Sequence, residues 1–259
     1  METTSKFIDL SRTIEHNLAD PWFMRIKIKH KAHKASYWII RLFIGLPKEL
    51  FPQHFSGWAD DSIRKMGVHA STHIDAPWHY GPISEGKPAK TVDQIPLDWC
   101  YGPGVKIDMR HKQELDPITA NDLKEAVQKS GVKIEKGNIV LIQTGRDKFS
   151  GTAEYPSKGT GMSKEATLWL IEQGVKVMGI DQWGWDLPLN HQAKLAKEKN
   201  DKSIFWEGHL VGLEHEYCHM EQLVNLEALP DQGFKISVFP LKIKGASASP
   251  ARVVAMLND

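Results

Sequence analysis

Residues 68–79 most restrict the fold and function that this chain can have, because several possible metal ligands lie close together there. In an extended strand, successive side chains alternate between two faces. One face would carry the polar residues His69, Ser71, His73 and Asp75. The other face would carry small and apolar residues that can pack against a core. The pattern therefore predicts a strand with one coordinating face and one packing face.

A helix is the competing geometry, because residues four apart, as His69 and His73 are, share a helical face. Against a helix, Thr72 and Ile74 are β-branched, and Pro77 disfavours continued helical structure. We therefore expect a short strand that ends at Pro77, with His79 brought back toward it by the following turn.

Distances along such a strand bear on the number of metal ions. A fully extended run from His69 to Asp75 covers roughly 20 Å, whereas His73 and Asp75 lie roughly 7 Å apart and can share an ion. Either His69 serves a second ion or the strand bends sharply. Two ions about 3.5–4 Å apart with a bridging carboxylate are common in hydrolytic sites. Asp75, between the histidines, is the natural bridge.

A second group of possible ligands lies between residues 206 and 221. His215-Glu216-x-x-His219 matches the zincin pattern, in which two histidines on one helical face bind zinc and the glutamate is the base. A zincin-type metalloprotease is therefore an alternative. However, no capping box precedes the motif, no histidine-bearing continuation follows it, and it leaves residues 69–79 without a role.

Composition limits the possible binding partners and the cellular compartment of the protein. The 33 Lys and Arg residues balance 32 Asp and Glu residues, which gives no support for nucleic acid as the main partner. Two cysteines are too few for a disulfide framework, and residues 1–10 lack the pattern of a signal peptide. We expect a cytoplasmic protein with a small-molecule substrate and no membrane span.

Residues 21–58 are the least ordinary segment, with a basic run at 27–34 and an apolar run at 37–46. The apolar run contains Arg41 and has roughly half of the 20 residues that a membrane span needs. We expect a variable lid over the site or an oligomer-contact helix. A surface-lying amphipathic helix is the alternative, and the basic run is either a solvated face or an attractor of anionic substrate.

The rest of the chain alternates between predicted strands and helices. Strands are expected at 105–109, 138–143 and 175–180, and helices at 119–129 and 163–173, which Thr119 and Ser163 can cap. Further strands are expected at 234–239, 241–244 and 252–257. This order predicts an α/β fold with a mixed central sheet flanked by helices, in one domain over residues 1–259.

The motif His69-x-x-x-His73-x-Asp75-x-Pro77-x-His79 resembles the signature of the metal-dependent cyclase family. This family includes bacterial kynurenine formamidases, isatin hydrolases and trans-dienelactone hydrolases. Other stretches resemble its landmarks in the family's order, among them 95–98, 179–181 and 240–245. The family usually has glycine where this chain has Ser71. The resemblance covers most of the chain and implies a swivelling β/α fold.

The resemblance also implies a ligand set. It adds His209 and Glu221 as closing ligands, with Glu221 just ahead of a helix over residues 220–226. One ion would then be held by His69, His73, Asp75 and Glu221. The other would be held by Asp75, His79, His209 and Glu221. Zinc or manganese suits these donors, as one or two ions per subunit. The residues expected to support the ligands from behind are Ser71, Thr72, His215 and His219.

These ligands predict hydrolysis in which metal-bound hydroxide attacks a carbonyl carbon. The sequence has no Gly-x-Ser-x-Gly motif, so a serine nucleophile is not favoured. A leaving nitrogen must be protonated by a general acid. We expect His79 in that role, and Glu221 if His79 is committed to metal.

Aromatic residues near the ligand segments suggest a flat substrate pocket, although they could equally fill the core. They are Trp78, Trp183, Trp185, Phe205 and Trp206. The stretches 205–209, 217–221 and 242–248 resemble the isatin-hydrolase-like branch of the family, which implies ring opening of an isatin-like lactam or a related lactone. The alternatives are an arylformamidase acting on N-formylkynurenine, a trans-dienelactone hydrolase, and a non-catalytic, metal-stabilised binding protein. The resemblance also implies a homo-oligomer, a dimer or tetramer.

Overall fold

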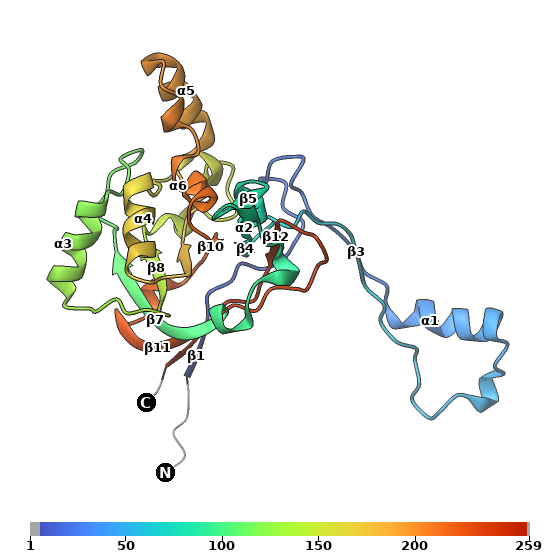
Figure 1. Cartoon of the computed structure of the whole chain (residues 1–259). Helices are drawn as coiled ribbons and strands as arrows, with labels where there is room; N and C mark the ends of the chain where they lie inside the picture. The colour runs from blue at the N-terminus through green and yellow to red at the C-terminus, as the bar shows by residue number, and fades with distance from the viewer. Residues whose placement is uncertain (1–5, 258–259) are drawn as a thin grey trace, which may run out of the picture. The chain divides into compact units, whose positions relative to one another are not determined.

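The computed structural model of the chain describes residues 6–257 (Figure 1). It contains two compact units. The larger comprises the described residues up to Thr13 and from Val68 onward, and the smaller comprises Ile14–Gly67. All of the predicted metal ligands belong to the larger unit.

A mixed sheet forms the centre of the larger unit (Figure 1). In spatial order, its nine strands among the described residues are β1 (Lys6–Asp9), β13 (Val254–Leu257), β11 (Gln232–Ser237), β7 (Tyr101–Asp108), β8 (Ile139–Gln143), β9 (Val177–Ile180), β10 (Cys218–Glu221), β4 (His73–Asp75) and β12 (Ala248–Pro250). Strands β7 to β10 run parallel to one another, and the other pairings are antiparallel. The predicted α/β class with a mixed sheet is confirmed.

Strand β8 shows how the sheet separates two apolar cores. Ile139 and Leu141 belong to one buried cluster, and Val140 and Ile142 to the other, because side chains alternate along a strand. Burial on both faces explains why this strand is a continuous apolar run. The first cluster includes Ile74 of β4 as well as Ala255 of β13, which lie near opposite ends of the strand order. The sheet therefore curls around this core.

Two helices cover the other face, α3 (Ala120–Ser130) and α4 (Lys164–Glu172). Both begin where their caps predict. Thr119 Oγ1 accepts from the Asp122 N–H at 3.2 Å, and Ser163 Oγ accepts from the Ala166 N–H at 3.2 Å. Each satisfies a backbone donor that has no partner within the helix.

The remaining elements of the larger unit are short, apart from α5. The helices are α2 (Pro77–Tyr80), α5 (Leu189–Lys199) and α6 (Glu207–Leu210). The 3₁₀ turns are η3 (Val92–Gln94), η4 (Leu97–Trp99), η5 (Arg146–Phe149), η6 (Tyr155–Ser157), η7 (Lys202–Ile204), η8 (Val211–Leu213) and η9 (Leu226–Ala228). A small hairpin pairs β5 (Ile83–Ser84) with β6 (Lys87–Pro88).

Two expected elements are wrong. No helix forms over residues 220–226, because Gln222 (φ 58°) and Asn225 (φ 62°) adopt left-handed backbone conformations that a right-handed helix cannot contain. No strand forms over residues 241–244. There the Ile243 N–H donates to the Leu241 carbonyl at 2.8 Å, a local turn that takes the place of ladder pairing.

The smaller unit contains the helix expected within residues 21–58. Helix α1 (His33–Ile39) continues into the π-helical turn η1 (Ile40–Ile44), and a 3₁₀ turn η2 (Lys48–Leu50) follows. Strands β2 (Lys27–Lys29) and β3 (Ser62–Lys65) form an antiparallel pair.

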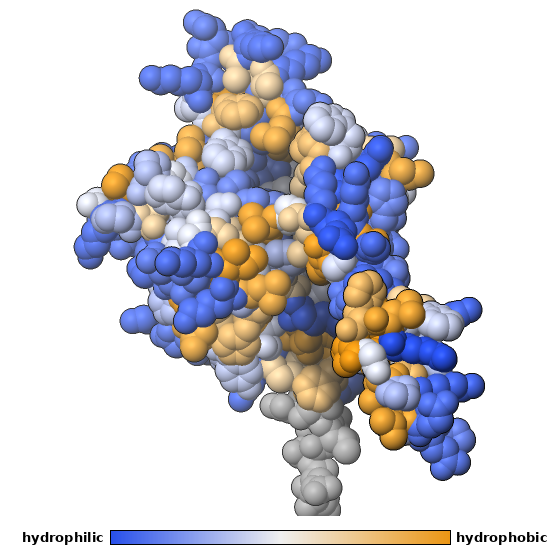
Figure 2. All heavy atoms as spheres, turned by 90° about the vertical axis from the view of Figure 1, so that its right-hand side faces the viewer, coloured by the Kyte–Doolittle hydropathy of each residue, from blue (hydrophilic) through white to orange (hydrophobic). Residues whose placement is uncertain are grey.

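Apolar side chains are unusually exposed in this smaller unit, and Figure 2 shows apolar groups at the molecular surface. Those of η1 are among the most exposed, with Phe43 at 84% and Leu42 at 70%. Among residues 6–257, no helix is both long and apolar enough to cross a bilayer.

Candidate metal centre

The chain bends sharply at Ser71, just ahead of β4. Its φ of 60° lies in the left-handed region that glycine adopts without strain. The bend folds His69 back onto β4, so that its Nδ1 lies 2.8 Å from Asp75 Oδ1. The expected fully extended strand over 69–75 is therefore wrong, and the sharp bend that was its alternative is present. Glycine, which the family resemblance implies at this position, would suit the same conformation.

Pairing of β4 with β10 brings the acidic residues and two histidines together. His219 pairs with Asp75, and Glu221 pairs with His73. Paired residues on neighbouring strands point to the same face, so these four side chains share one face of the sheet. Met220 and Ile74, paired between them, belong to the apolar core on the other side.

The first of two ligand groups consists of His69, His73 and Asp75. His73 Nε2 lies 3.3 Å from Asp75 Oδ1 and 3.5 Å from Glu221 Oε2. Its other ring nitrogen is hydrogen-bonded to the Ser71 carbonyl at 2.8 Å, which aims Nε2 at the carboxylates. His69 Nε2 is hydrogen-bonded to Ser247 Oγ at 3.0 Å.

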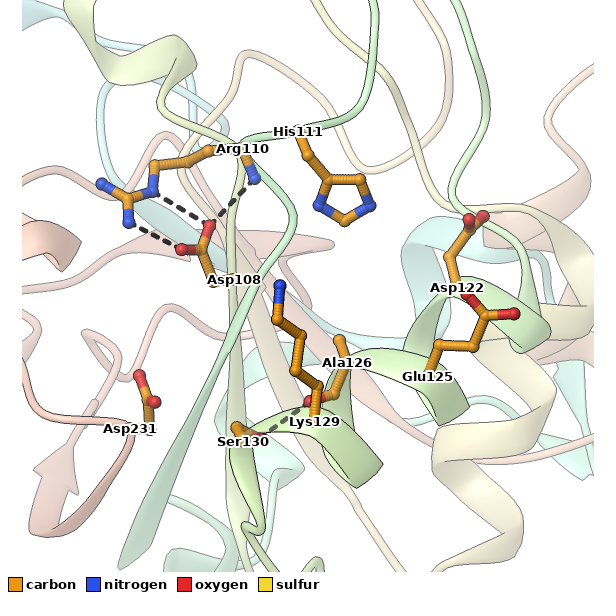
Figure 3. A pocket seen from close by; sticks show the side chains of 9 residues that line it. All are labelled: Asp108, Arg110, His111, Asp122, Glu125, Ala126, Lys129, Ser130 and Asp231. Atoms are coloured by element: carbon orange, nitrogen blue, oxygen red, sulfur yellow. Dashed lines mark hydrogen bonds and ion pairs between the residues drawn. The ribbon is translucent and has the colours of Figure 1, made fainter.

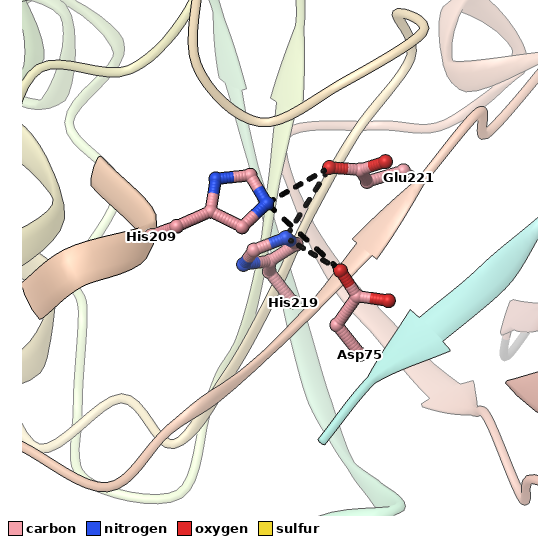
Figure 4. A group of neighbouring side chains, drawn as sticks. All are labelled: Asp75, His209, His219 and Glu221. Carbon is pink, nitrogen blue, oxygen red and sulfur yellow. Dashed lines mark ion pairs between the residues drawn. The ribbon is translucent and has the colours of Figure 1, made fainter. Parts of the chain in front are cut away.

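The second group consists of Asp75, His209, His219 and Glu221, whose side chains point toward one another (Figure 4). His219 Nε2 lies 3.3 Å from both Asp75 Oδ2 and Glu221 Oε1. His209 Nε2 lies 4.0 Å from Asp75 Oδ2 and 3.7 Å from Glu221 Oε1. Asp75 thus belongs to both groups. Its role as a bridge between two ions stays a prediction.

His209 is oriented by a residue that the sequence analysis missed, Asp186. The Asp186 carboxylate contacts His209 Nδ1 and also accepts from the Gly208 N–H at 2.7 Å. Trp206 stacks on the His209 ring, with ring centroids 4.5 Å apart. Asp186 lies six residues beyond the end of β9, near the carboxyl end of a parallel strand, where ligand sites are common. That position is the only signal that could have found it.

Four buried atoms at this centre have no hydrogen-bond partner among residues 6–257. They are His73 Nε2, Asp75 Oδ1, Asp75 Oδ2 and His219 Nε2. The 2.8 Å contact between His69 Nδ1 and Asp75 Oδ1 is an ion-pair distance without hydrogen-bond geometry. Buried polar atoms are normally paired, because leaving them unpaired costs free energy. Converging imidazole and carboxylate donors are the ligands that zinc and manganese prefer. The residues present therefore fit a divalent metal ion.

The electrostatics agree with a cation site. Burial alone would raise the pKa of Asp75, but the surrounding imidazoles, His73 first among them, hold it well below its usual value. Burial alone would lower the pKa of His219, but Asp75 and Glu221 raise it to about 9. The carboxylates are thus held in their anionic, metal-binding form.

His79 lies on α2, directly after β4, as the predicted turn requires. Its Nε2 is 3.6 Å from Asp75 Oδ2, and its side chain keeps 23% of its surface exposed. Burial lowers its pKa to about 4, against the opposing charge of Asp75. Of the expected ligands, His69 and His79 are the most open to solvent.

The zincin alternative is wrong, because His215 and His219 do not share a helix. His215 lies outside any helix and His219 lies in strand β10. Glu216 is paired with Lys90 at 2.6 Å. His215 belongs to neither candidate ligand group, whereas His219 belongs to the group with Asp75, His209 and Glu221. The Thr72 hydroxyl donates to the Gln222 carbonyl at 2.6 Å, which joins the start of β4 to the end of β10.

The expected aromatic residues lie in different environments. Trp78 and Phe205 are 42% and 43% exposed. Trp206 packs on His209, and Trp183 makes an edge contact with Tyr155. Trp185 is completely buried and stacks on His219, so it supports that ring and cannot line an open pocket.

A hollow of about 760 Å³ lies away from these ligands, beside α3 and the end of β7 (Figure 3). Arg110, which lines the hollow, is paired with Asp108 at 2.6 Å. It contains none of the predicted site residues.

Comparisons with known proteins agree with this fold. The sequence matches a family model described as putative cyclase over residues 8–187. A kynurenine formamidase from Bacillus cereus is 27% identical over 204 residues, covering 79% of this chain and 83% of that protein. Isatin hydrolase A from Ralstonia solanacearum superposes with a TM-score of 0.70 at 25% identity, covering 98% and 92% of the two chains. Isatin hydrolase A from Labrenzia aggregata, bound to benzyl benzoate, gives 0.71 at 23% identity, with 98% and 94% covered.

Proposed function

The chain belongs to the putative cyclase family, and on that premise we propose that it is a metal-dependent hydrolase of carbon–nitrogen bonds. One observation carries the proposal. Buried histidine and carboxylate atoms that lack hydrogen-bond partners among the described residues converge on the shared residue Asp75. A purely structural core would not leave such atoms unpaired.

Metal binding would supply Lewis-acid chemistry to this site, activating water and polarising a carbonyl oxygen. The chain supplies the side chains that would hold the metal, arranged around Asp75. His69 and His73 approach Asp75 from one side, and His209 approaches it from the other. Because β4 and β10 are interior strands, Asp75 and Glu221 are held rigidly in the sheet.

His79 is the proposed acid–base residue. Its partly exposed ring lies at the edge of the ligand groups, where it can reach both a substrate and the attacking water. Its Nε2 would accept a proton as the water oxygen bonds to the carbonyl carbon. It would then return that proton to the leaving nitrogen as the carbon–nitrogen bond breaks. Glu221 is the second candidate for this proton transfer.

We propose a cyclic amide of the isatin type as the substrate. The exposed rings of Trp78 and Phe205 and the half-buried ring of Trp206 flank the ligand segments and suit a flat, aromatic molecule. The similarity to isatin hydrolase A supports this choice. N-formylkynurenine is the second candidate, supported by the similarity to kynurenine formamidase.

The test uses purified protein stripped of metal and then resupplied with Mn²⁺ or Zn²⁺. We expect metal-restored loss of isatin absorbance, abolished in His73→Ala and retained in His215→Ala, which changes a histidine outside the site. N-formylkynurenine and a trans-dienelactone are assayed on the same samples. If chelation unfolds the protein, and no substrate turns over with either ion, the ions are structural and the chain is a metal-stabilised binding protein. Hydrolysis that survives complete metal removal would also contradict the proposal.

A further inference from the structure

We propose that His219 is itself a metal ligand and completes a second cation site with Asp75, His209 and Glu221. This inference rests on the proposed metal dependence of the enzyme. It differs from the ligand set that the family resemblance implies, in which His79 takes this place. His219 would bind the second ion, and His79 would remain free to meet the substrate.

The distances around His219 suit a shared ion better than direct ion pairs. Charge-assisted hydrogen bonds between nitrogen and a carboxylate are about 2.7–2.9 Å long. His219 Nε2 instead lies 3.3 Å from Asp75 Oδ2 and 3.3 Å from Glu221 Oε1. Two ligand atoms each about 2.1 Å from one ion at the tetrahedral angle lie about 3.4 Å apart. The ring nitrogen and the two carboxylate oxygens are therefore spaced as ligands of one ion.

The other ring nitrogen of His219 has a partner, which fixes the direction of Nε2. Tyr80 Oη is hydrogen-bonded to His219 Nδ1 at 3.1 Å, and Tyr217 Oη contacts the same nitrogen at 3.4 Å. A second-sphere partner of this kind sets the tautomer and the aim of a metal-binding histidine. Nε2, by contrast, is buried and has no hydrogen-bond partner among residues 6–257.

Aromatic rings hold the imidazole of His219 in place. Trp185 stacks on it with centroids 4.9 Å apart and planes 12° apart, and Tyr80 stacks at 5.3 Å and 23°. The Trp185 backbone N–H donates to Glu221 Oε1 at 2.7 Å, so the same residue also positions a carboxylate of the site. Tyr217 Oη donates to the Gly208 carbonyl at 2.9 Å and ties β10 to helix α6, which carries His209.

His79 fits the second site less well than His219. Its Nε2 is 3.6 Å from Asp75 Oδ2, and no ion pair joins it to Glu221 within the described structure. Its ring is partly exposed, whereas that of His219 is fully buried. A solvent-facing imidazole is better placed for contact with substrate than for closing a buried site.

The test measures metal binding directly, with Mn²⁺ as the probe. Metal-free protein is titrated by calorimetry, its metal content after dialysis is measured by mass spectrometry, and the electron paramagnetic resonance spectrum reports coupling between neighbouring ions. We expect two ions per chain and a coupled spectrum for the wild type. His219→Ala should bind one ion and lose the coupling, while His79→Ala should keep both.

Tyr80→Phe covers the case in which His219→Ala fails to fold. It keeps every ring and removes only the nearer of the two hydroxyls that contact His219 Nδ1, so affinity for the second ion should fall about 10- to 100-fold. The inference is overturned if the wild type binds one ion, if His219→Ala keeps two ions at unchanged affinity, or if His79→Ala loses one. The proposed function fails separately: a protein that binds two ions through His219 but hydrolyses none of the three substrates would refute the function and leave the inference standing.

Discussion

Asp186 holds His209 in place by contacting its Nδ1 atom through a carboxylate that also accepts hydrogen bonds from the Gly208 and His209 backbone N–H groups. One carboxylate therefore fixes both the start of helix α6 and the aim of its histidine. Asp186→Asn should lower Mn²⁺ affinity about 10- to 100-fold, because the partner that sets the tautomer is weakened. Calorimetric titration checks this, with the exposed Glu198→Gln as the matched control. Equal affinities for the two variants would contradict it.

Ser71 is a point of backbone strain, and glycine should relieve it. Ser71→Gly should leave unfolding free energy unchanged or raised by up to about 1 kcal/mol, because the left-handed conformation costs glycine nothing. The Ser71 hydroxyl donates to the Arg12 and Thr13 carbonyls at 3.3 and 3.4 Å, and this loss offsets part of the gain. Ser71→Val should destabilise the protein by more than about 1 kcal/mol, since the branched side chain adds strain. Urea unfolding separates these outcomes, and a valine variant as stable as the glycine variant would exclude strain at this position.

The cap of α3 contributes to stability without touching the site. Thr119→Ala should lower the free energy of unfolding by about 1 kcal/mol, because it removes the acceptor for the Asp122 N–H. Mn²⁺ affinity should stay the same. Thermal unfolding and metal titration of one sample check both statements, and a change in affinity would show that α3 is coupled to the metal centre.

The metal-free protein should lose stability as the pH rises from about 6.5 to about 9. The pKa of His219 is raised to about 9 in the folded state, mainly because Asp75 and Glu221 outweigh the effect of burial. The unfolded value is about 6.5, so this contribution is complete below that pH and is lost through the folded pKa. His219→Gln should weaken the dependence of the unfolding free energy on pH between about 6.5 and about 9. An equally steep profile in the variant would assign the change to another group.

The exposed apolar side chains of η1 should mediate self-association with a second copy of the chain, as the family resemblance implies. Large exposed apolar patches on soluble proteins commonly mark interaction sites. Replacing Leu42, Phe43 and Ile44 by serine should reduce the molar mass measured by light scattering to that of one chain. Leu97→Ser, at an equally exposed leucine of the larger unit, serves as the control. An unchanged mass in the triple variant would place the contact elsewhere.

Elements with local causes were predictable from sequence. The side chains of Thr119 and Ser163 cap their helices through residues only three positions away. The apolar run of β8 predicts a strand that is buried on both faces, as observed. The bend at Ser71 was foreseen only as one of two alternatives, because a serine gives no local sign of a left-handed backbone.

Features that depend on distant pairing were not predictable. His215 and His219 look alike in the sequence, and only the pairing of β10 with β4 places His219 opposite Asp75 and leaves His215 outside the site. The expected helix after Glu221 likewise gave way to two left-handed residues that tertiary contacts impose. Asp186 acts on a histidine 23 positions further along the chain, and only its place near the carboxyl end of β9 marks it.

Strand β4 also has a consequence for how the protein is made. Its three residues pair on one side with β10 and on the other with β12, which follow roughly 140 and 170 residues later, so the contacts that close the centre are among the least local in the fold. Asp75 leaves the ribosome long before either neighbouring strand exists. The nascent chain must keep a histidine-rich, partly apolar segment unpaired until Ala248–Pro250 has been synthesised. If the centre binds metal as proposed, loading would therefore come late in folding, after translation has delivered both neighbours of β4.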